Sequence, residues 1–108
     1  MADKYLDRAM IFKALGDPKR IMIIEMLSKG ELCVCKILEK FDMAQSTLSH
    51  HMGLLSKSGF VIGRNEGKWT YYSLNPQGFK KAEQVIEHLS PNKPKLIVTN
   101  PDAQDGSL

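Results

Sequence analysis

The sequence predicts a mostly α-helical domain that carries one small β-hairpin. Apolar residues recur at helical spacing in five segments, and the pattern changes to a period of two only between residues 61 and 74. With 108 residues, 43% of them hydrophobic and 25% charged, the chain has the length and composition of one globular domain. We expect residues 1–90 to form this domain. Residues 91–108, where Pro, Asn, Asp, Gly and Ser are frequent, are expected to be a mobile tail.

Three helices are expected before residue 42. The first covers residues 4–15, and the second runs from a cap at Asp17 to Lys29. Because residues 21–27 are nearly all apolar, the second helix is expected to leave few positions to solvent and to form the centre of the core. A third helix is expected over residues 31–41.

The fourth helix is expected to carry a functional surface. Between Gln45 and a stop at Gly59, the apolar residues Leu48, Met52 and Leu55 repeat at helical spacing, so one stripe faces the core. The opposite face consists of short polar side chains with almost no charge. Such a face suits the major groove of DNA, which is about 12 Å wide and admits one helix.

A hairpin and a last helix follow. Residues 61–64 and 68–74 are expected to be strands joined by a tight turn at residues 65–67. Asn75 and Pro76 then start a last helix that extends to Leu89. Three helices, a turn, a fourth helix, a hairpin and a final helix form the element order of a winged helix-turn-helix, with the hairpin as its wing.

The distribution of charge indicates a polyanionic partner. Residues 43–81 carry five bases and one acid, although the whole chain has a net charge of only +3. Double-stranded DNA is therefore the expected partner, and a winged domain that binds protein instead stays an alternative. The predicted contacts lie on the fourth helix, for base edges and nearby phosphates, and on the wing, for the backbone or minor groove: Gln45, Ser46, Thr47, Ser49 and His50, and then Arg64 and Lys68.

The cysteines are the second candidate site. Cys33 and Cys35 lie one residue apart in a chain whose N-terminus shows no export signal, so we expect a cytoplasmic protein with free thiols. Thiolates bind soft ions, and two are too few to close a tetrahedral site. Side chains two residues apart point about 200° apart on a regular helix, so an ion bridging both sulfurs is expected to unwind or distort the start of the third helix. A redox switch that uses the same pair stays an alternative.

Two classes of protein are not expected. The sequence contains no Cys-x-x-Cys pair and no βαβ pattern, which argues against a thiol enzyme. Its apolar runs are far shorter than the roughly 20 residues of a membrane span.

Four motifs resemble the ArsR/SmtB family of metal-responsive winged helix-turn-helix repressors. They are the segments 15–20, 31–35, 45–55 and 64–75, and the resemblance extends over roughly residues 8–89. It implies a homodimeric repressor that leaves its operator when a soft metal or metalloid binds, and the cysteine pair is most similar to the arsenite-sensing branch. Leu38 stands where such sensors often have a third cysteine, and Ala44 stands where Ser or Thr is usual. Arsenite would then be held by Cys33 and Cys35, with hydroxide or a small cellular thiol in its third position.

The first and last helices predict the homodimer independently. Both residues 6–15 and residues 79–89 present broader apolar faces than one small core needs. A two-fold dimer places its two recognition helices about 34–36 Å apart and therefore requires an operator with two-fold symmetry.

Overall fold

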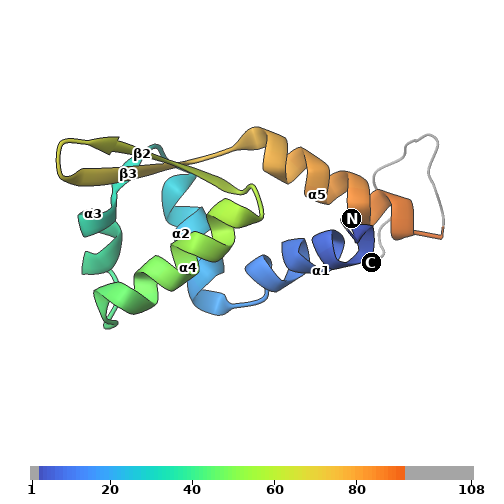
Figure 1. Cartoon of the computed structure of the whole chain (residues 1–108), viewed down its shortest axis with the longest axis horizontal. Coiled ribbons are helices and arrows are strands. Elements are labelled where there is room, and N and C mark those ends of the chain that lie inside the picture. Colours follow the sequence, from blue (N-terminus) through green and yellow to red (C-terminus); the bar gives the residue numbers. More distant parts are fainter. Residues whose placement is uncertain (1–2, 92–108) are drawn as a thin grey trace, which may run out of the picture.

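The computed structural model describes residues 3–91, which form five α-helices and three β-strands (Figure 1). In chain order these are α1 (Lys4–Leu15), α2 (Pro18–Leu27), β1 (Leu32–Cys33), α3 (Val34–Glu39), α4 (Gln45–Lys57), β2 (Val61–Glu66), β3 (Trp69–Leu74) and α5 (Pro76–Leu89). The predicted winged helix-turn-helix is confirmed. The strands and α3 lie at one end of the molecule, α1 and α5 lie together at the other, and α2 and α4 lie between them.

No helix within residues 3–91 is long and apolar enough to cross a membrane. The predicted tail lies outside the described residues except for Pro91.

The helix starts follow from local capping chemistry. Asp3, Asp17 and Asn75 precede α1, α2 and α5, and each accepts hydrogen bonds from backbone N–H groups in the first turn. Pro18 and Pro76 occupy first helical positions, where a missing N–H is harmless. Helix α4 differs, because Ala44 at its N-cap makes no side-chain hydrogen bond.

The core lies between α1, α2, α4 and the sheet. Its largest fully buried side chains come from α2, α3, α4 and the residue before β2: Ile23, Ile37, Leu48, Met52, Leu55 and Phe60. The expectation that α2 leaves few positions to solvent is wrong, because Ile21 and Met22 are 47% and 48% exposed. The apolar residues of α2 are distributed over all of its faces, but only the stripe of Arg20, Ile23 and Leu27 is buried.

The prediction of a helix from residue 31 is wrong at its start. Leu32 and Cys33 form the short strand β1, which pairs with β3, and α3 begins only at Val34. The sheet order is β1-β3-β2, with all neighbours antiparallel. Strand β1 exists because the wing offers it a hydrogen-bonding edge, which the local pattern of apolar residues does not reveal.

The turn of the wing is shifted toward the C-terminus relative to its prediction. Glu66 pairs with Trp69, so the turn consists of Gly67 and Lys68 rather than residues 65–67. Gly67 has a φ of +64°, a conformation that glycine adopts without steric cost. The turn therefore exposes Lys68 at the tip of the wing.

Candidate functional site

The two cysteines meet at the junction of β1 and α3. Cys33 is the last residue of β1 and the N-cap of α3, and Cys35 lies in the first turn of that helix. The Cys35 thiol donates a hydrogen bond to Sγ of Cys33, and the two sulfur atoms are 2.7 Å apart. Cys33 is buried, whereas Cys35 is exposed. The fold thus assembles a pair of free thiols with one sulfur open to solvent.

The premise of the expected unwinding is wrong. It placed both cysteines in one regular helix, whereas the backbone of Cys33 is extended, with φ −68° and ψ 144°. This conformation turns the side chain back over the start of α3, so that Sγ also accepts a hydrogen bond from the backbone N–H of Cys35 at 3.4 Å. Both sulfurs can therefore reach one ion while α3 stays folded.

The two thiols differ in acidity. The hydrogen bond from Cys35 lowers the pKa of Cys33, and backbone N–H groups and the charge of Lys36 act in the same direction. The same hydrogen bond raises the pKa of Cys35, because losing the proton would break the bond. Cys33 is thus the first of the pair to form a thiolate, which is the form that binds soft ions.

An ion-pair network joins the cysteine strand to the wing. Both carboxylate oxygens of Glu31 accept hydrogen bonds from Arg64 at 2.8 Å, and Glu66 accepts a third at 2.9 Å. These bonds lower the pKa of Glu31 and raise that of Arg64. The guanidinium also lies 4.7 Å from the ring centre of Tyr71, the residue that pairs with Cys33 across the sheet. Cys33 is therefore attached to the wing by backbone pairing and by a neighbouring salt bridge.

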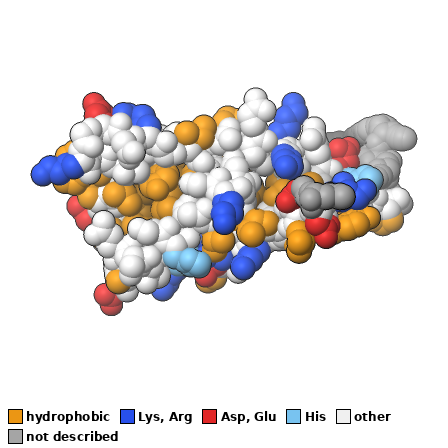
Figure 2. All heavy atoms as spheres, viewed as in Figure 1, with side chains coloured by type: hydrophobic (Ala, Val, Ile, Leu, Met, Phe, Trp, Pro, Cys, Tyr) orange, Lys and Arg blue, Asp and Glu red, His pale blue; other side chains and the backbone are white. Residues whose placement is uncertain are grey.

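A pocket of about 270 Å³ lies beside Cys35, between α3, the start of α4 and the tip of the wing. Figure 2 shows hydrophobic side chains in a hollow at this end of the molecule. The walls combine apolar and polar side chains: Val34, Leu38, Trp69, Gln45, Lys68 and Thr70. Within residues 3–91 no three His, Cys, Asp or Glu side chains lie together as a metal site would require. A third donor to an ion on the cysteines must come from elsewhere, and this pocket offers it room.

The predicted DNA-contacting residues occupy two surfaces. Those on α4 are all exposed, on the side opposite its buried stripe: Gln45, Ser46, Thr47, Ser49 and His50. Lys68 is exposed at the wing tip and lines the same pocket as Gln45, so these surfaces meet beside Cys35. Arg64 is placed differently, because two carboxylates already engage its guanidinium.

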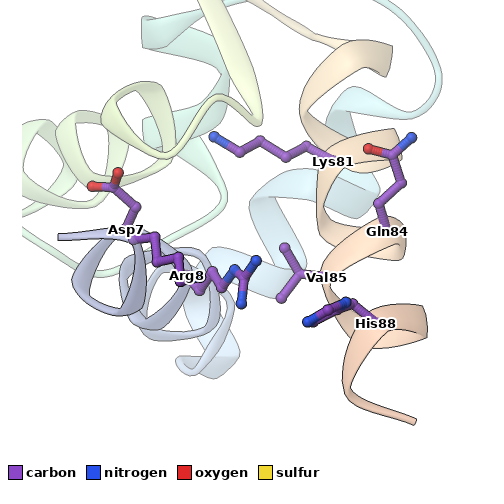
Figure 3. Close-up of a pocket in the computed structure, with 7 residues that line it drawn as sticks. Asp7, Arg8, Lys81, Gln84, Val85 and His88 are labelled. Atoms are coloured by element: carbon purple, nitrogen blue, oxygen red, sulfur yellow. The ribbon is translucent and has the colours of Figure 1, made fainter. Parts of the chain in front are cut away.

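The opposite end of the molecule has another character. A pocket of about 360 Å³ lies between α1 and α5, and Figure 3 shows Val85 and His88 of α5 pointing toward Arg8 of α1. Large apolar side chains on these two helices are exposed nearby: Tyr5, Leu6, Phe12, Ile86 and Leu89. This end thus combines exposed apolar surface with basic side chains.

Sequence reasoning missed one polar contact in the core. Arg20 and His51 are both buried and hydrogen-bonded to each other, although they are 31 residues apart in the chain. A signal was present, since Arg20 lies three residues before Ile23 in the inward stripe of α2, and His51 lies three residues after Leu48 in that of α4. A polar residue in an apolar stripe indicates a buried partner.

Comparison with known proteins agrees with this geometry. Residues 17–62 match the model described as "Bacterial regulatory protein, arsR family". The arsenical resistance operon repressor of Staphylococcus aureus is 44% identical over 101 residues, which cover 94% of this chain and 97% of that protein. An uncharacterized HTH-type transcriptional regulator of Methanocaldococcus jannaschii is 41% identical over 88 residues, which cover 81% and 99%.

A solved structure leads to the same family. The crystal structure of an ArsR family transcriptional regulator superimposes with a TM-score of 0.73 at 27% identity, covering 82% of this chain and 91% of the other. The chain therefore belongs to the ArsR family of winged helix-turn-helix proteins and is a DNA-binding transcriptional regulator, not an enzyme.

Proposed function

We propose that the protein is a repressor that arsenite, or another thiophilic ion, releases from its operator by binding Cys33 and Cys35. The observation that carries this proposal is the distance of 2.7 Å between the two sulfur atoms at the junction of β1 and α3. The relative from Staphylococcus aureus, similar along nearly the whole chain, is named as an arsenical resistance operon repressor, which supports arsenite as the effector. We also infer a cytoplasmic protein, because a repressor must reach its operator DNA.

The chemistry of binding is a ligand exchange without oxidation. Arsenous acid carries three hydroxyl groups on trivalent arsenic, and each cysteine thiol replaces one of them by forming an As–S bond. Each departing hydroxide takes the thiol proton and leaves as water. The third position keeps its hydroxide or takes a small cellular thiol, for which the pocket beside Cys35 has room. Trivalent arsenic is a soft centre, which suits thiolate ligands.

Ion binding has a direct route to both DNA-contacting surfaces. An ion that bridges Cys33 and Cys35 fixes their sulfur atoms at the distance that its own bonds require, which is about 3.8 Å for two bonds of about 2.3 Å in a tetrahedral zinc site. Cys33 belongs to a strand paired with the wing, and Cys35 belongs to the first helix of the helix-turn-helix. Any adjustment of the two sulfurs to the ion is therefore passed to the wing and to α3 and, through the shared pocket, to Gln45.

The operator contacts are assigned to α4 and the wing. We infer that α4 enters the major groove and that its exposed residues reach base edges and nearby phosphates: Gln45, Ser46, Thr47, Ser49 and His50. Lys68 meets the backbone or minor groove from the wing tip. Arg64 can contact the DNA backbone or minor groove only if its guanidinium gives up a salt bridge to Glu31 or Glu66 and binds a phosphate instead.

The active species is a homodimer on a two-fold symmetric operator. The exposed apolar side chains of α1 and α5 support this assignment, because Leu6 and Leu89 are 68% and 62% exposed, unusually so for leucines. A symmetric interface there does not cover α4, which lies between the two ends of the molecule, so both copies are free to enter successive major grooves.

Operator release tests the effector assignment. The promoter upstream of the protein's own coding region, carrying a fluorescent label, is titrated with protein by anisotropy, and arsenite is then added. A coupling free energy of about 1–3 kcal/mol lowers DNA affinity by about 5- to 150-fold. Cys33→Ser and Cys35→Ser should each abolish this response and still bind the promoter. Glu39→Ser, an exposed change in the same helix, is the matched control and should respond like the wild type.

Two outcomes contradict the proposal. One is a double Cys33→Ser, Cys35→Ser variant that still leaves DNA on addition of arsenite. The other is wild-type protein that binds arsenite equally well with and without the promoter, because linkage makes the coupling reciprocal. Release by peroxide without release by arsenite would favour the redox switch, in which the same thiols form a disulfide or a sulfenic acid.

A further inference from the structure

We propose that Arg20 and His51 position the recognition helix α4 for operator binding, and that they do so only while His51 is uncharged. The inference rests on the proposed function in two respects, which are that α4 enters the major groove and that α1 belongs to the dimer surface. The cysteine site plays no part in it. The pair consists of two buried polar side chains that join three helices and that effector binding does not use.

The guanidinium of Arg20 connects α1, α2 and α4. Nε donates a hydrogen bond of 2.7 Å to the carbonyl of Ala14, and Nη2 donates one of 3.1 Å to the carbonyl of Lys13, both at the end of α1. Nη1 lies 2.8 Å from Nδ1 of His51 on α4. Arg20 and His51 are each only 7% exposed. A guanidinium has a planar, fixed set of donors, so these three bonds fix α4 relative to the end of α1.

The contact determines the protonation of His51. Arginine has donors and no acceptor, so Nδ1 of His51 must be the acceptor in the bond to Nη1. The ring is therefore neutral and carries its proton on Nε2. Protonation at Nδ1 would direct an N–H group at a buried cation and break the bond between α2 and α4.

The surrounding charges reinforce this preference. Burial of the ring is the main reason that the pKa of His51 lies below its usual range, and the positive charges of Arg20, His50 and Lys19 act in the same direction. Asp17, the cap of α2, opposes them. A histidine whose pKa is lowered in the folded protein stabilises it fully above the usual value, about 6.5, and loses that contribution as the pH falls toward the lowered value.

Operator binding requires this geometry because of where the three helices lie. Helix α1 carries part of the proposed dimer surface, and α4 carries the surface proposed to read DNA. The separation of two recognition helices in a dimer depends on how each α4 is held relative to its own α1. A two-fold operator accepts only one separation of the two recognition helices. Losing the hydrogen bonds of Arg20 therefore weakens binding to both half-sites together.

Operator affinity as a function of pH tests the inference. Wild-type protein should keep its affinity from about pH 8 to about 6.5 and lose it as the pH falls further toward about 5, with a slope of up to about tenfold per pH unit for one proton. His51→Asn keeps an acceptor near the position of Nδ1 but does not titrate. This variant should therefore bind the operator well at about pH 8 and should not lose affinity as the pH falls.

Arg20→Lys tests the positioning role directly. Lysine keeps the charge but cannot reach three acceptors in one plane, so the folded variant should bind the promoter about tenfold or more weakly, at a fixed pH and with its folded fraction measured by circular dichroism. A structural role alone predicts a lower melting temperature with unchanged affinity of the folded protein. That result overturns the inference, as does a wild-type pH profile in His51→Asn.

A change in Gln45 separates this inference from the proposed function. If Gln45→Ala alters sequence preference while the Arg20 and His51 variants behave like the wild type, only the positioning role is wrong. If Gln45→Ala leaves sequence preference unchanged, α4 is not the recognition helix and the premise itself fails.

Discussion

The two helices of the helix-turn-helix begin in different ways. Helix α3 is capped by a sulfur atom, because Sγ of Cys33 accepts the backbone N–H of Cys35. Helix α4 has Ala44 at its N-cap and no side-chain hydrogen bond there. The other three helices start with the usual carboxylate or amide oxygen of Asp or Asn.

This difference matches the two roles that we propose for these helix starts, namely effector binding at α3 and DNA contact at α4. In the proposed function Cys33 both caps α3 and binds the ion, so an ion that takes the electron pairs of its sulfur weakens the capping hydrogen bond. The first turn of α4 contains Gln45, Ser46 and Thr47, which we assign to the operator. The proposal therefore assigns the start of α3 to the effector and the start of α4 to DNA.

The largest expected effect concerns what α4 reads. Gln45→Ala should relax sequence preference, because glutamine can pair with the edge of adenine, and such contacts are worth about 1–3 kcal/mol against the wrong base. Lys68→Ala, at the wing tip, is the matched contrast and should weaken all sequences alike and reduce the salt slope by about one. Anisotropy with operator and scrambled DNA at several salt concentrations distinguishes the two. If both variants lose only nonspecific affinity, α4 does not read the operator.

Much of the fold could be predicted because its signals are local. Asp17 and Pro18 mark the start of α2, and Asn75 and Pro76 mark that of α5, within two or three residues of sequence. Strand β1 could not be predicted this way. Its partner is β3, about 40 residues later, and two residues are too few to show a period.

In the candidate site, too, the features with local signals could be predicted and those that depend on distant residues could not. The polar face of α4 and the cysteine pair were evident from residue type and spacing. The proximity of the two sulfurs was not, because it depends on the extended backbone of Cys33, which β3 imposes through pairing. The pairing of Arg64 with Glu31 joins residues more than 30 positions apart and left no local signal. The pairing of Arg20 with His51 is equally distant in the chain, although the place of both residues in apolar stripes indicated buried partners.

A smaller effect is expected when α4 receives the cap that it lacks. Ala44 is exposed and its backbone is extended, with φ −70° and ψ 153°, as an N-cap requires. Ala44→Ser should therefore stabilise the protein by about 1 kcal/mol by accepting an N–H of the first turn. Thermal unfolding at one protein concentration should show a rise of about 4–8 °C. Ala44→Val, which supplies no acceptor, is the control, and an equal rise in that variant would exclude capping as the cause.

The smallest expected effect is the cap of α3. Cys33→Ser retains an acceptor for the backbone N–H of Cys35, whereas Cys33→Ala removes it, and the two side chains are similar in size. Because the N–H to sulfur distance is 3.4 Å and α3 has only six residues, the difference in unfolding free energy between the two variants should stay below the roughly 1 kcal/mol expected at position 44.

Chemical denaturation of both Cys33 variants, without arsenite, measures this difference. The serine variant should be the more stable of the two, because its buried hydroxyl is hydrogen-bonded to Cys35. Equal stabilities would mean that the side chain of residue 33 does not hold the start of α3. An ion on Cys33 would then have to act through the strand pairing with the wing alone, and arsenite would move the wing while leaving α3 unchanged.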